Sequence, residues 1–254
     1  MTRYALVLAA SLSFSATVHA DSTPALAVRS TFAPVRTKVT PRQWVKNVGK
    51  KVSSFLFAPR ARGGLQEAMV LAAELHKDQT RKGTTTPYIA HLMGVASITL
   101  EHGGTEQEAM AALLHDAVED QGGEKTRMVI ERRFGPHVAH LVSGLTDSAV
   151  EPKPPWRARK EAYLQHLVKS DNSVRLISMS DKLYNARAIV RDLEADGPKS
   201  FSKFSGGRDG VLWYYRSLVE TYNRTSSKGT PLLEELTQAV DQMHALAGNA
   251  PGGA

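Results

Sequence analysis

An acidic segment that also carries a histidine is the first place in this sequence where the residue types could perform chemistry. The segment LLHDAVEDQGG, residues 113–123, follows an apolar run and is expected to be helical. His115 and Glu119 are four residues apart, so they share a helical face. Asp116 and Asp120 have the same spacing. Because crowded carboxylates repel one another and a bound cation relieves that repulsion, the segment predicts a cation site.

Two further segments supply residues of the same kind. Asp181 lies in SMSDKLYNARAIV, residues 178–190, a strongly apolar helical pattern with Asn185 one turn later. A lone carboxylate among apolar residues is costly unless it is paired or coordinates a metal. In RKGTTTPYIAHLMGVA, residues 81–96, a cationic turn and a proline lead into a helix that carries His91.

Together these segments offer two imidazoles and two carboxylates, from His91, His115, Asp116 and Asp181. A mixed nitrogen and oxygen set with open positions suits Mn²⁺, Fe²⁺ or Zn²⁺ better than Ca²⁺. The chain has no cysteine, which excludes disulfides, thiolate zinc sites and cysteine nucleophiles. From spacing alone, the alternative for the adjacent His-Asp pair is a capped or salt-bridged helix surface.

The net charge of +7 is unevenly distributed along the chain. Residues 1–63 contain ten Lys/Arg and one acid, a net charge of +9, whereas residues 64–254 contain 22 Lys/Arg and 24 Asp/Glu, a net charge of −2. Domains that bind nucleic acid are usually basic or carry a basic stripe. We therefore do not expect nucleic acid as a partner of the nearly neutral part.

The basic N-terminal quarter has two parts. Residues 1–20 have the form of a secretory signal peptide, with one arginine, an apolar run and small residues before a cleavage site. This predicts a periplasmic or secreted protein, and the alternative is an unprocessed cytoplasmic chain. Residues 21–64 are expected to be a basic, mostly disordered tether. Its segment 44–57 could form an amphipathic helix that contacts an anionic membrane surface, or an arm that packs on the domain.

Residues 65–248 are expected to form one all-α domain of about eight to ten helices, because their apolar spacing is helical. The first helix is expected to bury a face made of Leu65, Met69, Ala72 and Leu75. Thr105 and Glu108 have the form of a capping box, which predicts a helix running to about Asp120. The remaining predicted helices are 124–134 and 136–145, hinged at Gly135, followed by 157–169, 173–194, 209–226 and 230–247.

The motifs HLMGVA, LLHDAVED and SDKLYNARAI, in this order, resemble those of the HD-domain phosphohydrolases. The resemblance is strongest to the hydrolase half of the RelA/SpoT alarmone enzymes and to their small stand-alone hydrolase relatives, and it extends from about Leu65 to Arg216. It implies an HD-domain helical bundle. Gln121 and Ala188 depart from the usual pattern, which affects fine specificity. No synthetase domain follows, so degradation alone is expected.

The resemblance also implies roles for individual residues. It implies that one Mn²⁺, or alternatively Fe²⁺ or Zn²⁺, is held by four side chains: His91, His115, Asp116 and Asp181. Glu119 and Asp120 would assist the attacking water. Arg81 and Lys82 would lie near the phosphates and the base, and Asn185 would hold the nucleotide.

The activity implied is hydrolysis of the 3′-pyrophosphate of ppGpp or pppGpp, giving GDP or GTP and pyrophosphate by a metal-activated water. One alternative is an HD phosphohydrolase that acts on another phosphorylated nucleotide. Another is a binding or regulatory module without turnover, although a pure binder has no need of both Glu119 and Asp120. The sequence does not define an oligomeric state.

Several further residues are weaker candidates for contacts to the nucleotide. Tyr214, in the aromatic run Trp213-Tyr214-Tyr215, could face the base, or these rings could be core residues. Arg208 could contact a phosphate, and so could Lys160 or Arg157 from the basic segment WRARK. Among the other histidines, which are expected to pack, cap or face solvent, His76 is the most plausible exception because it ends the first helix near Arg81.

Overall fold

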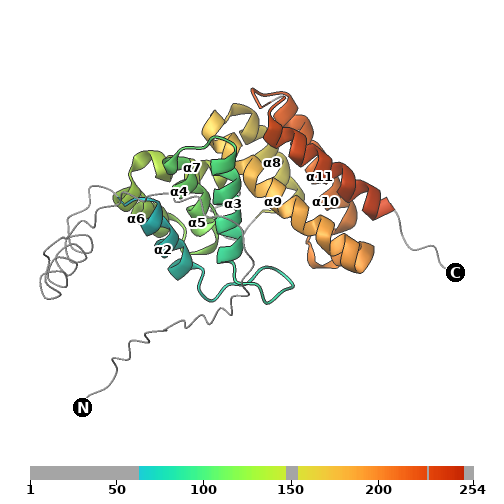
Figure 1. Cartoon of the computed structure of the whole chain (residues 1–254), viewed down its shortest axis with the longest axis horizontal. Helices are drawn as coiled ribbons and strands as arrows, with labels where there is room; N and C mark the ends of the chain where they lie inside the picture. The colour runs from blue at the N-terminus through green and yellow to red at the C-terminus, as the bar shows by residue number, and fades with distance from the viewer. Residues whose placement is uncertain (1–62, 147–153, 228, 249–254) are drawn as a thin grey trace, which may run out of the picture. The chain divides into compact units, whose positions relative to one another are not determined.

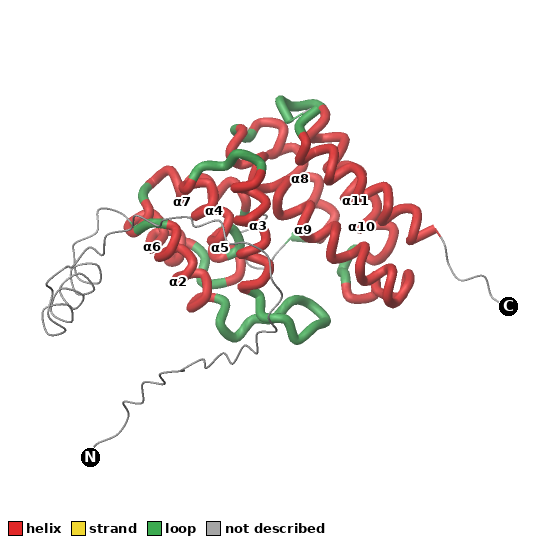
Figure 2. Tube along the Cα trace, viewed as in Figure 1, coloured by secondary structure: helices red, strands yellow, loops and turns green. Residues whose placement is uncertain are grey.

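The computed structural model describes residues 63–146, 154–227 and 229–248, and within these ranges its regular structure is helical (Figures 1 and 2). The helices are α2 (Leu65–Leu75), α3 (Ile89–Glu101), α4 (Glu106–Leu114), α5 (Ala117–Asp120), α6 (Glu124–Phe134), α7 (Pro136–Leu145), α8 (Trp156–Lys169), α9 (Asn172–Asp196), α10 (Gly207–Asn223) and α11 (Pro231–Gly248), with a 3₁₀ helix η1 (Gly197–Lys203). The predicted all-α bundle of eight to ten helices is confirmed.

The predictions for the N-terminal quarter lie outside the described residues. These are the signal peptide 1–20, nearly all of the tether 21–64, and the amphipathic segment 44–57. Among the helices that the structure does describe, none combines the length and the apolar character needed to span a bilayer.

Local sequence signals set most of the helix ends. At the start of α4, the Thr105 hydroxyl accepts from the Glu108 backbone amide, and the Glu108 carboxylate accepts from the Thr105 amide, which is the predicted capping box. Asp171 caps α9 by accepting from the Val174 amide at 2.8 Å. Gly135, with φ 94°, ends α6 and starts α7, as its position in the sequence predicted.

One predicted helix is interrupted. The sequence predicted a continuous helix from Thr105 to about Asp120, but α4 ends at Leu114 and the short α5 begins at Ala117. In an unbroken helix, His115 and Asp116 would point about 100° apart. The interruption at these two residues instead lets both side chains turn toward one point.

The predicted buried face of α2 was partly wrong. Met69 is 41% exposed, whereas Ala68 and Ala72 are fully buried. The alanines permit α2 to approach α4 closely, because their side chains are small, and the longer Met69 is turned toward solvent.

Two hydrophobic clusters share the long helix α9. One cluster is formed by α2–α7 and includes Val174 and Ile177 from the first turns of α9. The other is formed mainly by α8, α10 and α11 and includes Met179, Leu183 and Ile189 from the rest of α9. Figure 1 shows α9 between these two groups of helices. A residue at the middle of α9 therefore lies where elements from both clusters meet.

A turn between α2 and α3 brings a cationic segment to the same region. The Arg81 amide donates to the Thr86 carbonyl at 2.8 Å, and the Tyr88 amide donates to the Gln79 carbonyl at 2.9 Å. Gly83 adopts φ 76°, which the tip of this turn requires. The turn thus places Arg81 and Lys82 close to the start of α3.

Candidate metal centre and substrate cavity

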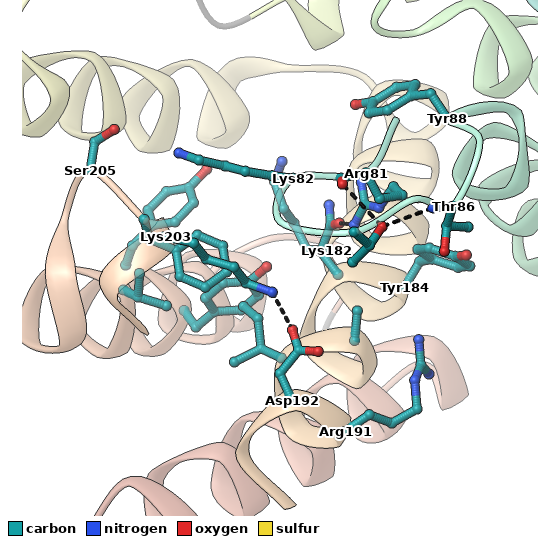
Figure 3. A pocket seen from close by; sticks show the side chains of 18 of the residues that line it. Arg81, Lys82, Thr86, Tyr88, Lys182, Tyr184, Arg191, Asp192, Lys203 and Ser205 are labelled. Carbon is teal, nitrogen blue, oxygen red and sulfur yellow. Dashed lines mark hydrogen bonds and ion pairs between the residues drawn. The ribbon is translucent and has the colours of Figure 1, made fainter. Parts of the chain in front are cut away.

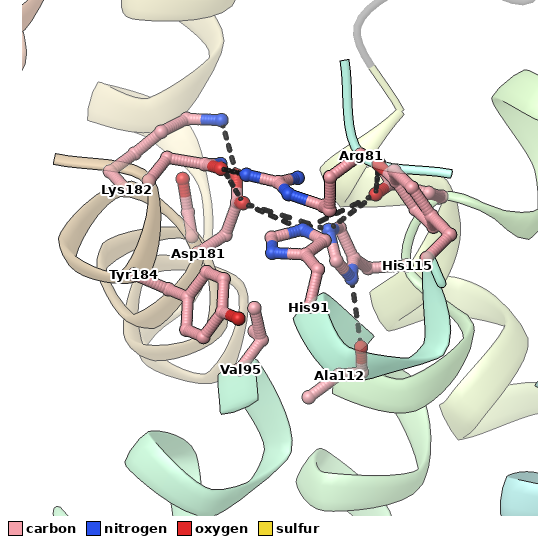
Figure 4. A network of polar contacts seen from close by, with 12 residues as sticks. Arg81, His91, Val95, Ala112, His115, Asp181, Lys182 and Tyr184 are labelled. Atoms are coloured by element: carbon pink, nitrogen blue, oxygen red, sulfur yellow. Dashed lines mark hydrogen bonds and ion pairs between the residues drawn. The ribbon is translucent and has the colours of Figure 1, made fainter. Parts of the chain in front are cut away.

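The structure brings together the four side chains expected to bind a metal. His91 comes from α3, His115 and Asp116 from the interruption between α4 and α5, and Asp181 from the middle of α9 (Figure 4). The distances from ring nitrogen to carboxylate oxygen are 3.6 Å for His91–Asp116, 3.3 Å for His91–Asp181, 2.9 Å for His115–Asp116 and 3.8 Å for His115–Asp181.

The donor set fits a divalent cation. One ligand atom each from His91, His115 and Asp116 lies within 4.8 Å of the others, so these three residues could bind one metal ion. His115 donates from Nδ1 to the Ala112 carbonyl at 2.8 Å, which leaves Nε2 as the ligating nitrogen. That Nε2 is buried and lies 2.9 Å from Asp116 Oδ2. A lone pair facing a carboxylate is unfavourable unless a cation or a proton lies between them.

The pKa shifts of His115 and Asp116 also indicate that a positive charge is needed between these two side chains. Burial by itself lowers the pKa of His115, but the charge of Asp116 and its hydrogen bond raise the pKa to about 9. Conversely, although burial raises the pKa of Asp116, the His115 and His91 rings hold it well below its usual range. The pair is therefore stable only with a positive charge between the groups, which a divalent ion supplies.

Asp181 is hydrogen-bonded to Asn185, one turn later in α9, and also to Lys182, a partner that the sequence did not indicate. Its Oδ2 accepts from Lys182 Nζ at 2.5 Å, and its Oδ1 accepts from Asn185 Nδ2 at 2.5 Å. Burial raises the pKa of Asp181, but the Lys182 ammonium and the two imidazoles lower it further than burial raises it. Residues adjacent in sequence do not share a helical face, so the usual spacing rule gave no reason to pair Lys182 with Asp181.

Tyr88 is a second residue that the sequence argument missed. Its hydroxyl donates to Asp116 Oδ2 at 2.7 Å, and its ring stacks on His76 with centroids 5.2 Å apart. It also meets the edge of the His91 ring at 5.4 Å. Its position three residues before His91 was a usable signal, since residues three apart on a helix are neighbours.

Glu119 and Asp120 line a cavity of about 300 Å³ together with the four candidate ligands. Burial raises the pKa of Asp120, and the nearby charges of Asp116 and Glu119 add to the increase, while a hydrogen bond from Gln79 opposes it. Both side chains thus lie in the cavity that the four candidate ligands line, which is the location that the predicted role in assisting a water requires.

A small hydrogen-bond network holds the Asp120 side chain in position. Gln79 Nε2 donates to Asp120 Oδ2 at 2.9 Å, and Gln79 Oε1 accepts from Gln121 Nε2 at 2.9 Å and from His76 Nδ1 at 2.7 Å. Gln121, which departs from the family pattern, thus has a structural partner. His76 is buried, and it contributes to the site through Gln79 and Tyr88.

A larger cavity of about 610 Å³ adjoins the smaller one (Figure 3). Six residues line both: Tyr88, Trp156, Lys160, Lys182, Asn185 and Tyr214. Arg81 and Lys82 line the larger cavity, where Arg81 donates to Asn185 Oδ1 at 2.5 Å and lies 5.6–5.7 Å from the ring centroids of Tyr88 and Tyr184. A ligand of nucleotide size could extend from the metal site into this cavity.

The weaker candidates separate into two groups. Lys160 and Tyr214 line both cavities, and the Lys160 ammonium lies 5.0 Å from the Tyr214 ring. Arg157 instead lies 3.2 Å over the Trp213 ring and bonds to Glu161. The structure does not bring Arg208 to either cavity, because its guanidinium donates to the Ala247 carbonyl at the end of α11.

The comparisons with known proteins point to one family. The sequence profile described as HD domain matches residues 68–212. The guanosine-3′,5′-bis(diphosphate) 3′-pyrophosphohydrolase MESH1 of Xenopus tropicalis is 40% identical over 140 residues, which cover 54% of this chain and 73% of the relative. MESH1 of Mus musculus is 39% identical over 181 residues, covering 70% of this chain and 93% of the relative.

Matches of lower identity include a larger protein and a solved structure. The bifunctional (p)ppGpp synthase/hydrolase SpoT of Escherichia coli K12 is 35% identical over 131 residues, which cover 49% of this chain and 18% of SpoT. A solved structure of a metazoan ortholog of SpoT, described as hydrolysing ppGpp, has a TM-score of 0.58 and 29% identity, and the match covers 73% of this chain and 98% of the other. The resemblance stated from the sequence motifs is thus confirmed.

Proposed function

Because the chain belongs to the HD-domain family, we propose that it hydrolyses the 3′-diphosphate of guanosine 3′,5′-bis(diphosphate). The products are GDP and pyrophosphate, or GTP and pyrophosphate from the 5′-triphosphate form. The names of the relatives support the substrate. The proposal rests on one observation: a His/Asp metal-binding set adjoins a basic cavity of nucleotide size.

The proposed metal is Mn²⁺, held by His91, His115, Asp116 and Asp181. Two nitrogen and two oxygen ligands support Mn²⁺, with Fe²⁺ and Zn²⁺ as alternatives. When bound, the ion would supply Lewis-acid polarisation of a phosphoryl oxygen and would make a water more acidic.

The chain's own residues perform the proton and charge steps. A water oxygen bonds to the 3′-linked phosphorus while the bond from that phosphorus to the ribose 3′ oxygen breaks. Glu119 takes the proton of the attacking water, and Asp120 orients that water and supports the transfer. The departing 3′ oxygen takes up a proton and becomes the hydroxyl of GDP. Lys182 and Arg81 stabilise the negative charge on the phosphoryl oxygens during this step.

The test is direct. The purified full chain is stripped of metal with a chelator, supplied with Mn²⁺ and guanosine 3′,5′-bis(diphosphate), and assayed for GDP and pyrophosphate by ion-exchange chromatography. We expect equal amounts of both products, the fastest turnover with Mn²⁺ among Mn²⁺, Fe²⁺, Zn²⁺ and Ca²⁺, and a loss of about a hundredfold or more for Glu119→Gln.

A matched control is Glu131→Gln, which alters a partly exposed carboxylate of α6 that pairs with Arg127 and lines neither cavity. This variant should turn over like the parent. Absence of turnover with all four metals would contradict the proposed reaction, and turnover restricted to a different phosphorylated nucleotide would contradict the proposed substrate.

A further inference from the structure

The two adjoining cavities differ in their balance of charged side chains, and the larger one is strongly basic. The described residues that line the larger cavity include six cationic side chains and one carboxylate, Asp192; the cations are Arg81, Lys82, Lys160, Lys182, Arg191 and Lys203. The smaller cavity is lined by four carboxylates, Asp116, Glu119, Asp120 and Asp181, and by three cationic side chains, Arg159, Lys160 and Lys182, the last two of which it shares with the larger cavity. A ligand that extends across both should therefore place its reacting group at the acidic, metal-binding end and a second anionic group at the basic end.

Lys203 lies at the basic end, in the part of the larger cavity that the smaller one does not share. It comes from the last residue of η1, and its Cδ would lie 3.4 Å from a Cβ on Gly83, so its stem reaches the turn that carries Arg81 and Lys82. Its ammonium also lies 5.3 Å from the Phe204 ring. Lys203 thus connects two walls of the cavity that are far apart in sequence.

Asp192 holds this ammonium in place. Lys203 Nζ donates to Asp192 Oδ2 at 2.5 Å, as the dashed line in Figure 3 shows. The two side chains are 24% and 34% exposed, so the pair is partly shielded from water but open to a ligand in the cavity. Asp192 orients Lys203 and at the same time neutralises it, so an incoming phosphate competes with the carboxylate for the ammonium.

The proposed substrate has a group with the chemistry that this end requires. With the 3′-diphosphate at the metal-binding end, the ribose carries its second phosphate chain on the 5′ carbon, away from the reacting phosphorus. Lys182 and Asn185 line both cavities, which is where a ribose between the two phosphate chains would pass. The 5′ chain is then directed toward the basic end.

Resting on the proposed function, we propose that Lys203, oriented and neutralised by Asp192, determines specificity for the 5′-phosphate chain of the guanosine substrate. The Lys203 ammonium binds the 5′-phosphate chain when it separates from the Asp192 carboxylate. The strength of the Asp192–Lys203 pair sets how tightly the 5′-phosphate chain must bind to displace that carboxylate. The pair would thereby distinguish nucleotides by the phosphate on the 5′ carbon, although the reaction takes place at the 3′-diphosphate.

The experiment compares two substrates that differ only at the 5′ position: guanosine 3′,5′-bis(diphosphate), and guanosine 3′-diphosphate with a free 5′ hydroxyl. We expect Lys203→Gln to raise KM about tenfold for the first substrate, with kcat unchanged and with no effect on the second, because one charge-assisted hydrogen bond is lost. Asp192→Asn should lower KM for the first substrate only, because the amide still accepts from Lys203 but no longer neutralises it.

Two further variants separate this role from a structural one. Lys199 lies in the same 3₁₀ segment and pairs with Asp196 at 3.3 Å, but both side chains are well exposed and neither lines the cavity, so Lys199→Gln should behave like the parent. Lys203→Arg should restore the preference for the 5′-phosphorylated substrate. Equal KM changes for both substrates, or none for either, would overturn the inference while leaving the proposed function intact. A parent chain that hydrolyses neither substrate would overturn both.

Discussion

The side-chain amide of Gln79 donates a 2.9 Å hydrogen bond to the Asp120 carboxylate, although 41 residues separate the two in sequence. The orientation of the Gln79 amide is fixed, because its oxygen accepts from both Gln121 and His76. The hydrogen bond restrains the side chain that we propose supports the attacking water. Residues outside the metal-binding set thus determine the position of a carboxylate inside the site.

Gln79→Met should therefore lower kcat more than it changes KM, because it preserves side-chain volume but removes the donor to Asp120. A loss of about tenfold is expected for one hydrogen bond to a charged group. Since this bond lowers the pKa of Asp120, its removal should raise that pKa and move the acidic limb of the kcat profile to higher pH. Gln121→Ala keeps the donor and should have a smaller effect. An unchanged pH profile in Gln79→Met would contradict a positioning role.

Tyr88→Phe should weaken metal binding, because the variant loses the hydrogen bond to Asp116 while it keeps the ring that packs on His76 and His91. Loss of a partner that orients a ligand typically reduces metal affinity about 10- to 100-fold. The control is Tyr184→Phe, whose lost bond to the Ala90 carbonyl is long, at 3.3 Å. Titration calorimetry with Mn²⁺ measures both, and equal affinities in the two variants would show that the Tyr88 hydroxyl does not act on the site.

Gly94→Ala should destabilise the fold even though alanine favours helices over glycine. A Cβ at this position of α3 would overlap the Tyr184 ring, which packs on His91. Overpacking typically costs about 1–3 kcal/mol, which exceeds the helix-propensity gain of about 1 kcal/mol. We expect a lower Tm in thermal unfolding. Gly248→Ala, where a Cβ meets nothing within 4 Å, should not lower Tm.

Asp171→Ala should cost about 1 kcal/mol of unfolding free energy, since it removes the cap of α9. Burial raises the pKa of Asp171, but the Val174 amide and His140 lower it to a net value below normal. The charge therefore contributes stability above the pKa of the unfolded state, about 3.9, and this contribution is lost as the pH falls through the lower folded-state pKa. Urea unfolding at several pH values should show that dependence for the parent and less of it for Asp171→Asn.

The features that were predictable from the sequence are local ones. The capping box of Thr105 and Glu108, the hinge at Gly135 and the limits of the later helices depend on residues a few positions apart, and all were found where expected. The four candidate ligands were predicted from the acidic segment around His115, from Asp181 in an apolar helical pattern, and from the order of motifs that resembles the HD-domain phosphohydrolases.

The remaining contacts depend on how distant segments meet. Arg81 with Asn185, Gln79 with Asp120 and Lys203 with Asp192 each involve side chains that are separated by loops or helices and leave no periodic pattern in the sequence. The interruption between α4 and α5 was missed for a related reason. The residues around it favour a helix, whereas in the structure the interruption places His115 beside His91 of α3 and Asp181 of α9.

The 25-residue helix α9 supplies a wall to both hydrophobic clusters, so neither cluster can lose it without exposing its interior. Calorimetry of the domain should accordingly give a van't Hoff enthalpy equal to the calorimetric enthalpy, the signature of a single cooperative transition. Because Asp181 lies in this helix, assembly of the metal-binding set and formation of both halves become one thermodynamic event.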